Sequence, residues 1–244
     1  MTRTHSAHPA FCYVRRMTDE KLEPFWEVLS LLYKPHPWHG IAVGEKAPEK
    51  VNAYIEIVPT DTVKYELDKK TGYLKIDRPQ KFSNVYPTLY GFIPRTYCGE
   101  ASGELCAKRT GRVGIKGDGD PLDICVLSEK VITHGDVILE AIPIGGLRMI
   151  DGDEADDKII AVLEGDAVYG LWREISQMPP AMLERLKHYF LTYKHAPDSL
   201  QPEHVSITHV YGREEAYEVI RRARVDYDVR FKDLKQMMSA ALKG

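Results

Sequence analysis

The segment DGDPLDICVL, residues 118–127, joins a carboxylate-rich turn to an apolar strand. Its first half places Asp118, Asp120 and Asp123 within six residues, around a glycine and a proline that are typical of a turn. Its second half, LDICVL, is a short apolar run that predicts a buried strand. Three carboxylates are therefore expected where the chain enters the sheet.

Strand patterns lie on both sides of this segment. The candidates are AYIEIV (53–58), VKYEL (63–67), YLKID (73–77), DVILEAIPI (136–144), LRMI (147–150) and KIIAVL (158–163). Strands this closely spaced favour a small barrel or a sandwich. Apolar residues at helical spacing predict helices over 24–33, 180–193, 213–224 and 231–242. The predicted fold class is α+β, mainly β.

The chain of 244 residues is long enough to bury a sizeable core without disulfides or metals. It shows no internal repeat, low-complexity tract or interdomain linker. We expect residues 51–244 to form a single barrel domain with C-terminal helices, preceded by an N-terminal extension over 1–50 with one helix. Residues 95–117 are interpreted as an inserted excursion, which forms either a surface loop or an extra interface or lid. The sequence leaves open whether Met17 is an alternative start.

The formal net charge of −3 hides an uneven distribution. Residues 118–157 hold eleven acids and two bases, so the remainder of the chain is basic. The overall balance argues against a nucleic-acid binder driven by net charge. No apolar run reaches the ~18 residues of a membrane span, the N-terminus lacks the apolar core of a signal peptide, and the four cysteines show no CxxC spacing. We expect a cytoplasmic protein with reduced thiols.

A second acidic group, DGDEADDK (151–158), lies between two apolar strands and therefore on a connecting loop. Two loops at one rim of a barrel could bring both groups together. Like charges ~4 Å apart repel by about 4 kcal/mol at an effective dielectric of ~20, so the cluster needs cations. Oxygen ligands favour Mg²⁺, Mn²⁺ or Ca²⁺. An EF-hand is excluded, because Leu122 and Ala155 occupy the fifth ligand position.

Cations and phenols near strand positions complete the candidate chemistry. Lys64, Arg78, Lys158 and the pair Tyr193-Lys194 suit phosphate oxygens. Carboxylates for metals and separate cations for oxyanions indicate a metal-bridged phosphate substrate and phosphoryl transfer to water. The alternative is that the acidic turns are merely solvated and the cations are surface charges.

These residues closely resemble the family I soluble inorganic pyrophosphatases. DGDPLD followed by Ile124 fits the family signature D-[SGDN]-D-[PE]-hydrophobic-D. The resemblance extends over about residues 50–195. It includes IEIVP with Glu56, VKYELD with Lys64 and Glu66, IDR with Arg78, VYPTLYGFIP with Tyr86 and Tyr90, Asp151, Asp156 and Lys158 in the second acidic loop, and HYFLTYK ending in Tyr193-Lys194.

The resemblance implies a small OB-like β-barrel flanked by helices that hydrolyses pyrophosphate to two phosphates. It implies three or four Mg²⁺ ions, with Mn²⁺ as a possible substitute. A homo-oligomer is expected, and the sequence leaves open a hexamer, as in bacterial members, or a dimer, as in longer eukaryotic ones. No nucleic-acid or membrane partner is expected.

The resemblance also assigns roles to residues. Asp120 would be the catalytic base. The metal ligands would be Asp118, Asp123, Asp151, Asp156, Glu56 and Glu66, with Asp118, Asp123 and Asp156 on the first metal. The substrate ligands would be Lys64, Arg78, Tyr193 and Lys194, with Lys158 and Tyr90 in a supporting place.

Two other hypotheses use the same residues differently. A metal-dependent nucleotide phosphohydrolase or nuclease would share the carboxylate chemistry, but it would need a groove for base or backbone. The sequence shows no basic stripe with interleaved aromatics around the acidic loops. A non-catalytic scaffold would have lost some of the named residues, and all of them are present.

Overall fold

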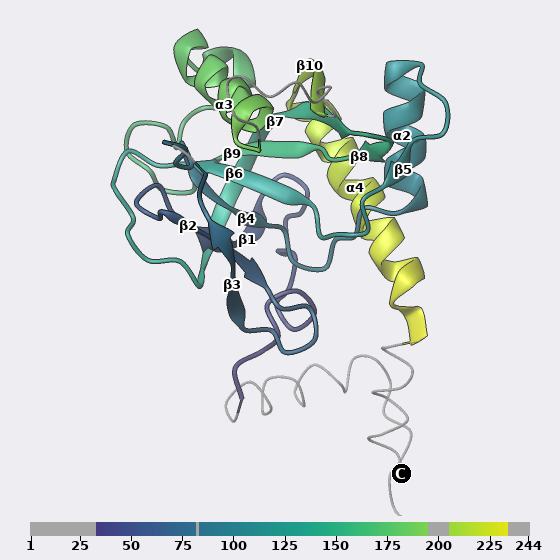
Figure 1. Ribbon diagram of the computed structural model, residues 1–244, viewed down its shortest axis with the longest axis horizontal. Coiled ribbons are helices and arrows are strands. Elements are labelled where there is room, and N and C mark those ends of the chain that lie inside the picture. The colour runs from purple at the N-terminus through teal and green to yellow at the C-terminus, as the bar shows by residue number, and fades with distance from the viewer. Residues whose placement is uncertain (1–32, 82, 195–204, 234–244) are drawn as a thin grey trace, which may run out of the picture. The chain divides into compact units, whose positions relative to one another are not determined.

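The computed structural model describes residues 33–81, 83–194 and 205–233 (Figure 1). Residues 35–228 form one compact unit, and a second unit comprises residues 1–34 and 229–244. The helices predicted for 24–33 and 231–242 lie almost wholly outside the described residues. The unit of residues 35–228 contains the sheet.

Five strands pair in a closed ring. Their order is β1 (Val51–Ile57), β4 (Leu89–Phe92), β6 (Asp123–Leu127), β9 (Lys158–Leu163) and β7 (Val137–Asp151), and β7 pairs back to β1. All these pairs are antiparallel except β6 with β9. The ring, together with the helices beside it, confirms the predicted α+β, mainly β fold.

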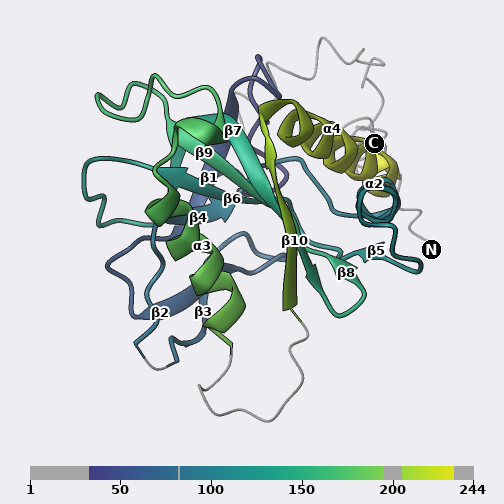
Figure 2. The same cartoon turned by 90° about the horizontal axis from the view of Figure 1, so that it is seen from above.

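Alternation along the ring strands divides the core in two. Ile124 and Val126 of β6 pack in one cluster, which gathers side chains from all five strands and from helix α4 (Arg213–Arg230). Cys125 and Leu127 point the other way and pack with helix α3 (Pro180–Thr192). Helix α3 begins on a proline, which suits the first turn. Figure 2 shows α3 and α4 on opposite sides of the sheet. Both helices were predicted.

Strand β7 corrects one prediction. Residues 136–144 and 147–150 were expected to form two strands, but they belong to one strand of 15 residues that runs through Gly145 and Gly146. A Cβ at Gly145 would lie 2.4 Å from the Tyr211 carbonyl oxygen, and one at Gly146 would lie 2.5 Å from the Tyr211 ring. The glycines therefore admit strand β10 (Val205–Gly212), which was not predicted and which pairs with β7.

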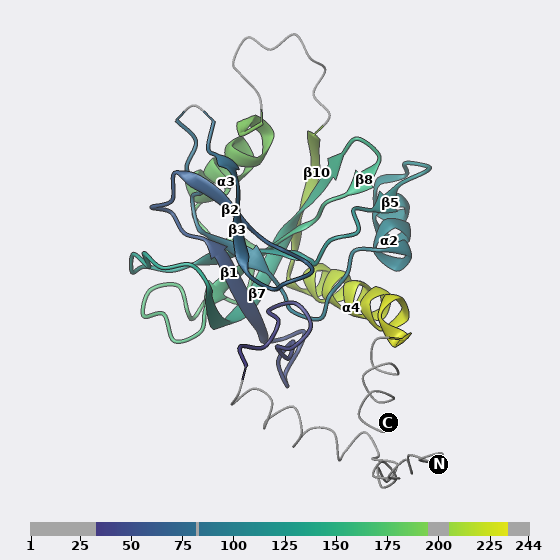
Figure 3. The same ribbon diagram turned by 60° about the horizontal axis from the view of Figure 1, so that its bottom comes forward.

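The predicted hairpin of 63–67 and 73–77 is present as a separate two-stranded sheet. It consists of β2 (Val63–Leu67) and β3 (Leu74–Pro79), and β2 contacts β1 (Figure 3). The turn closes with a hydrogen bond from the Gly72 amide to the Asp68 carbonyl, 2.8 Å long. Two short strands, β8 (Glu154–Ala155) and β5 (Lys116–Gly117), extend the main sheet beyond β7. A 3₁₀ turn, η1, covers Ile175–Gln177.

Residues 95–117 contain a packed helix, so their interpretation as a surface loop was wrong. Helix α2 (Glu100–Thr110) buries Leu105 and Cys106 and contacts β5 and β8. Its N-cap residue is a glycine without a side chain, and Asp226 of α4 supplies the cap instead. The Asp226 carboxylate accepts hydrogen bonds of 2.8–2.9 Å from the amides of Gly99, Ala101 and Ser102 and from the Ser102 hydroxyl.

Within the described residues, none of the helices combines the length and the apolar character that crossing a membrane requires.

Replacing Asp226 by alanine should destabilise the protein by about 2 kcal/mol, because three amides at the start of α2 lose their acceptor. Urea unfolding followed by circular dichroism measures the change. Glu218→Ala on the same helix is the control and should cost below about 0.5 kcal/mol, since it removes exposed ion pairs only. Equal stabilities for Asp226→Ala and Glu218→Ala would contradict the role of Asp226 as a cap.

Candidate active site

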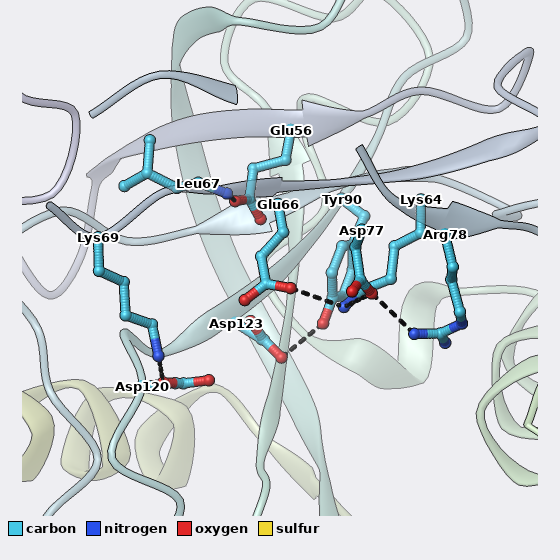
Figure 4. Close-up of polar contacts among 10 residues, drawn as sticks. All are labelled: Glu56, Lys64, Glu66, Leu67, Lys69, Asp77, Arg78, Tyr90, Asp120 and Asp123. Atoms are coloured by element: carbon cyan, nitrogen blue, oxygen red, sulfur yellow. Dashed lines mark hydrogen bonds and ion pairs between the residues drawn. The ribbon is translucent and has the colours of Figure 1, made fainter. Parts of the chain in front are cut away.

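A pocket lies between the β2–β3 hairpin and the N-terminal end of β6, where the sequence predicted a carboxylate-rich turn (Figure 4). Its lining combines acids, cations and aromatic rings. These residues are Trp38, Glu56, Lys64, Tyr65, Glu66, Leu67, Lys69, Tyr90, Phe92, Asp120, Pro121 and Asp123. Six residues that were assigned to the site from the sequence therefore meet at one pocket.

Strand register brings the two acidic segments together. Asp123 is the first residue of β6 and is paired with Lys158, the first residue of β9. The amide of Asp156 bonds the Met149 carbonyl at 3.0 Å, which holds Asp156 beside β7. Asp118 precedes β6 on a turn, where its carboxylate accepts the Asp120 amide at 2.9 Å. Carboxylates from two loops thus lie at one rim, as predicted.

Lys158 joins these carboxylates. Its ammonium contacts both Asp123 and Asp156, and its side chain is only 4% exposed. The nitrogen also lies 6.0 Å from the ring centre of Tyr90 and 5.8 Å from that of Phe190. Burial alone would lower the pKa of Lys158, but the two carboxylates raise it well above its usual value. Lys158 is therefore a fixed positive charge in the site.

The carboxylates remain under strong electrostatic pressure despite Lys158. Burial, and then the charges of Asp156 and Asp123, raise the pKa of Asp118 to about 8. Burial also raises the pKa of Asp156, although Lys158 acts in the opposite direction. The Tyr90 hydroxyl donates to Asp123 at 2.5 Å, and burial, followed by the Asp123 charge, raises the pKa of Tyr90 well above its usual value. The single positive charge of Lys158 therefore does not balance the negative charges of Asp118, Asp123 and Asp156.

Glu56 and Glu66 approach the pocket from the hairpin side. Glu56 is buried on β1 and accepts the Leu67 amide at 2.7 Å. Burial raises its pKa to about 8, although that hydrogen bond lowers it. Glu66 shares a face of β2 with Lys64, and the Lys64 nitrogen lies 3.4 Å from its carboxylate. Figure 4 shows both glutamates above Asp123.

The end of α3 brings a second set of predicted residues together. The Lys194 nitrogen lies 2.5 Å from Asp151 Oδ2 and 5.5 Å from the ring centre of Tyr193. The Arg78 guanidinium of β3 lies 5.9 Å from the same ring. Burial lowers the pKa of Lys194, but Tyr193 and Asp151 raise it to a net value above the usual one. Arg78, Tyr193, Lys194 and Asp151 thus form one group.

Sequence reasoning missed two members of the site. Asp77 on β3 lies 3.0 Å from the Lys64 nitrogen and 2.8 Å from Arg78 Nη1, so it holds both cations (Figure 4). The pairing of Lys64 with Arg78 across the predicted hairpin could have indicated it. Lys69, in the hairpin turn, contacts the Asp120 carboxylate. The spacing of the motifs gives no signal for a contact between two loops 51 residues apart.

The donor set fits hard divalent cations. Within residues 33–81, 83–194 and 205–233, no three His, Cys, Asp or Glu side chains are gathered as a ready ligand set. The ligand types are nevertheless all carboxylate oxygens, which Mg²⁺ prefers. The raised pKa values of Asp118 and Asp156 indicate that additional positive charge would stabilise the ionised cluster.

Comparisons with known proteins agree with this chemistry. A family model described as inorganic pyrophosphatase matches residues 53–228. An inorganic pyrophosphatase of Chlamydia trachomatis is 56% identical over 195 residues, which cover 79% of this chain and 93% of that one. A soluble inorganic pyrophosphatase of Solanum tuberosum is 43% identical over 159 residues, covering 65% and 66%. The crystal structure of the Thermus thermophilus inorganic pyrophosphatase superposes with a TM-score of 0.66 at 32% identity, covering 79% and 99%.

The raised pKa of Asp118 predicts a pH-dependent stability without metal. Between about pH 4 and 8 the folded chain retains a proton on Asp118 that the unfolded chain has released. The free energy of unfolding therefore falls as pH rises through this window. Asp118→Asn removes the penalty, so in EDTA at pH 9 it should be more stable than wild type by an amount on the order of several kcal/mol.

Urea unfolding at pH 5 and pH 9 measures this difference, which should be small at pH 5. With saturating Mg²⁺ the order should reverse, because the cation binds a charged carboxylate more tightly than a neutral amide oxygen. An Asp118→Asn variant that is less stable than wild type at pH 9 in EDTA would contradict the electrostatic interpretation.

Proposed function

The chain belongs to the inorganic pyrophosphatase family, and we propose that its pocket hydrolyses pyrophosphate to two phosphates with bound divalent cations. The observation that carries this proposal is the position of Asp123. The Lys158 ammonium contacts both Asp123 and Asp156, which links the two carboxylates. Asp123 also lines the pocket together with Glu56 and Glu66. Carboxylates at one rim, with separate cations beside them, suit a metal-bridged phosphate substrate.

The carboxylates of the two acidic loops, of β1 and of the hairpin are the proposed metal ligands. Asp118, Asp123 and Asp156 would hold the first metal, and Asp123 would also serve a second. Asp151, Glu56 and Glu66 would serve metals that arrive with the substrate. We propose Mg²⁺, three or four ions in all, with Mn²⁺ as a substitute. When bound, such cations neutralise phosphate charge and lower the pKa of a coordinated water.

Asp120 is the proposed base. It stands on the turn between Asp118 and Asp123, and its side chain is 45% exposed, so it can reach a water molecule in the pocket. As the water oxygen forms its bond to one phosphorus, the proton passes to the Asp120 carboxylate. The bond between that phosphorus and the bridging oxygen breaks, and the bridging oxygen leaves with the other phosphate. Lys69 contacts the Asp120 carboxylate from the hairpin turn.

The cations around the pocket are the proposed phosphate ligands. Lys64 and Arg78 lie on paired positions of the hairpin, with Asp77 between them. Tyr193 and Lys194 approach from the end of α3. Together they would bind the phosphate oxygens and stabilise the charge that develops on the leaving phosphate. Lys158 and Tyr90 support the site by holding Asp123 and Asp156.

We further propose that the enzyme acts in the cytoplasm as a homo-oligomer, without a nucleic-acid or membrane partner. Two observations support this proposal. The chain belongs to the same family as a relative that is named a soluble enzyme. Its net charge is also close to balanced.

Phosphate release from pyrophosphate should require Mg²⁺ and should depend on Asp123. Asp123→Ala removes a ligand and leaves Lys158 with one carboxylate fewer, so activity should fall by at least about 10²-fold while the chain stays folded. A phosphate-release assay with and without Mg²⁺ measures this, and circular dichroism checks folding. Glu184→Gln, an exposed change on α3, should keep wild-type activity.

Full activity in Asp123→Ala, or release unaffected by EDTA, would contradict the proposal. Nucleoside triphosphates at the same Mg²⁺ concentration test the alternative function. If the enzyme turned them over faster than pyrophosphate, it would be a nucleotide phosphohydrolase.

Lys194→Met should lower kcat/KM for pyrophosphate by about tenfold or more, because a charge-assisted contact to phosphate is worth at least about 1.4 kcal/mol. Steady-state kinetics at saturating Mg²⁺ measure the effect. Lys187→Met, on the helix that precedes Lys194, is the control, since Lys187 pairs only with Glu184 in the described structure. Equal kcat/KM values for the two variants would remove Lys194 from the substrate site.

A further inference from the structure

Arg148 is a fully buried charge that takes no part in the chemistry proposed above. It lies in the second half of β7, and its side chain has no exposed surface. Its Nε lies 3.0 Å from Asp157 Oδ1, and its Nη2 donates to Glu215 Oε1 at 2.9 Å. A buried ion pair of this kind is weak evidence for stability, because desolvating two charges costs about as much as their attraction returns. Its position suggests another role.

Strand register places Arg148 directly opposite Asp157. Ile150 is paired with Ala155 on one side of this position, and Leu147 is paired with Lys158 on the other. The same antiparallel register on both sides puts residue 148 across from 157 and residue 149 across from 156, and the Asp156 amide does bond the Met149 carbonyl. Directly opposed residues share a face of the sheet, so the Arg148–Asp157 ion pair forms straight across the two strands.

Asp157 separates two site residues that point the other way. Asp156 and Lys158 flank it in sequence, contact each other, and lie on the face of Tyr90 and Phe190. Asp157 faces Arg148 and Tyr211, which belong to the opposite side of the sheet. The Asp157 side chain therefore anchors the backbone between 156 and 158 on the face opposite the pocket, while the side chains of Asp156 and Lys158 face the pocket.

Two other elements contact Arg148, and a third contacts one of its partners. The Tyr211 ring of β10 lies 5.1 Å from its guanidinium carbon. Glu215 of α4 accepts from Arg148, and the same oxygen lies 3.2 Å from Arg109 Nε of α2. Arg109, Glu215, Arg148 and Asp157 thus form a series of ion pairs that links α2, α4 and β7 to Asp157, and its two positive and two negative charges balance. This series of contacts connects helix α2 to the side of the 156–158 backbone that faces away from the pocket.

We propose that the Arg148–Asp157 ion pair is a positioning pair, which fixes the 156–158 backbone so that Asp156 and Lys158 are aimed at the metal-binding carboxylates. The proposal rests on the proposed function for the identity of the site. A wholly structural pair would matter for folding alone. A positioning pair also sets how tightly the carboxylate cluster binds a divalent cation in the folded protein.

The test compares three variants with wild type: Arg148→Lys, Asp157→Asn and the double change Arg148→Met with Asp157→Leu. The double change leaves neither partner of the pair as an unpaired charge, and apolar replacements of buried pairs are usually tolerated, so it should fold. Glu218→Gln is the control, because it removes exposed ion pairs from the helix that carries Glu215.

Two readouts apply to folded protein only. Isothermal titration calorimetry with Mn²⁺ alone measures metal affinity, and the Mg²⁺ concentration for half-maximal pyrophosphate hydrolysis measures activation. Asp157→Asn and the double variant should each weaken Mn²⁺ binding and raise the Mg²⁺ midpoint by about tenfold, which is about 1.4 kcal/mol. Arg148→Lys, which keeps the charge but not the planar fork, should shift both about threefold. At saturating Mg²⁺, KM should change less than about twofold, since the phosphate ligands are untouched.

Wild-type Mn²⁺ affinity in the folded double variant would overturn the proposal, since the ion pair would then carry no positioning. If the double variant does not fold, Arg148→Lys decides in the same way, and an unshifted Mn²⁺ affinity again overturns the proposal. The failure of the proposed function is separate. It would show as a wild-type protein that binds Mn²⁺ but releases no phosphate from pyrophosphate.

Discussion

The mutual repulsion of buried carboxylates is the constraint on which the rest of this molecule depends. Asp118, Asp123 and Asp156 come from two loops, and burial together with their own charges raises the pKa values of Asp118 and Asp156. A chain left to its local preferences would separate them. They stay together because paired strands fix where each loop begins and because Lys158, almost wholly buried, contacts two of them. The uncompensated charge is what a divalent cation can satisfy.

The ring of strands provides this rigidity through period-two alternation. Along β6 and β9, alternate residues pack either with α4 or with α3, so both faces of each strand are buried. A shift of register by one residue would place charged residues such as Asp123 and Lys158 among apolar side chains of the opposite cluster. The hydrophobic core therefore determines the position of the polar site. The parallel pairing of β6 with β9 places both strand beginnings, and so both acidic loops, at one end.

The sequence allowed prediction of those parts whose signals are local. The DGDPLD turn, the β2–β3 hairpin and helix α3 each follow from spacing within a short window, and the structure has all three. The continuous β7 was missed because Gly145-Gly146 resembles a turn until Tyr211 is placed against it. Helix α2 was missed because its cap is Asp226, more than a hundred residues away. Lys69 and Asp77 were missed because their partners are set by tertiary packing.

The buried charges behind the site follow from the same alternation. A strand that aims Asp156 and Lys158 at the pocket must turn the residue between them to the opposite face, which lies in the core. An apolar residue at that position would pack in the core, but it would not fix the position of the backbone as well, because dispersion contacts have little directionality. A carboxylate that faces an arginine at a fixed register position is attracted to that one partner, although burying the pair costs desolvation. The carboxylates of this site must be held in place against their mutual repulsion, so a desolvation cost that fixes the backbone behind them is useful here. The Arg148–Asp157 ion pair lies at that position.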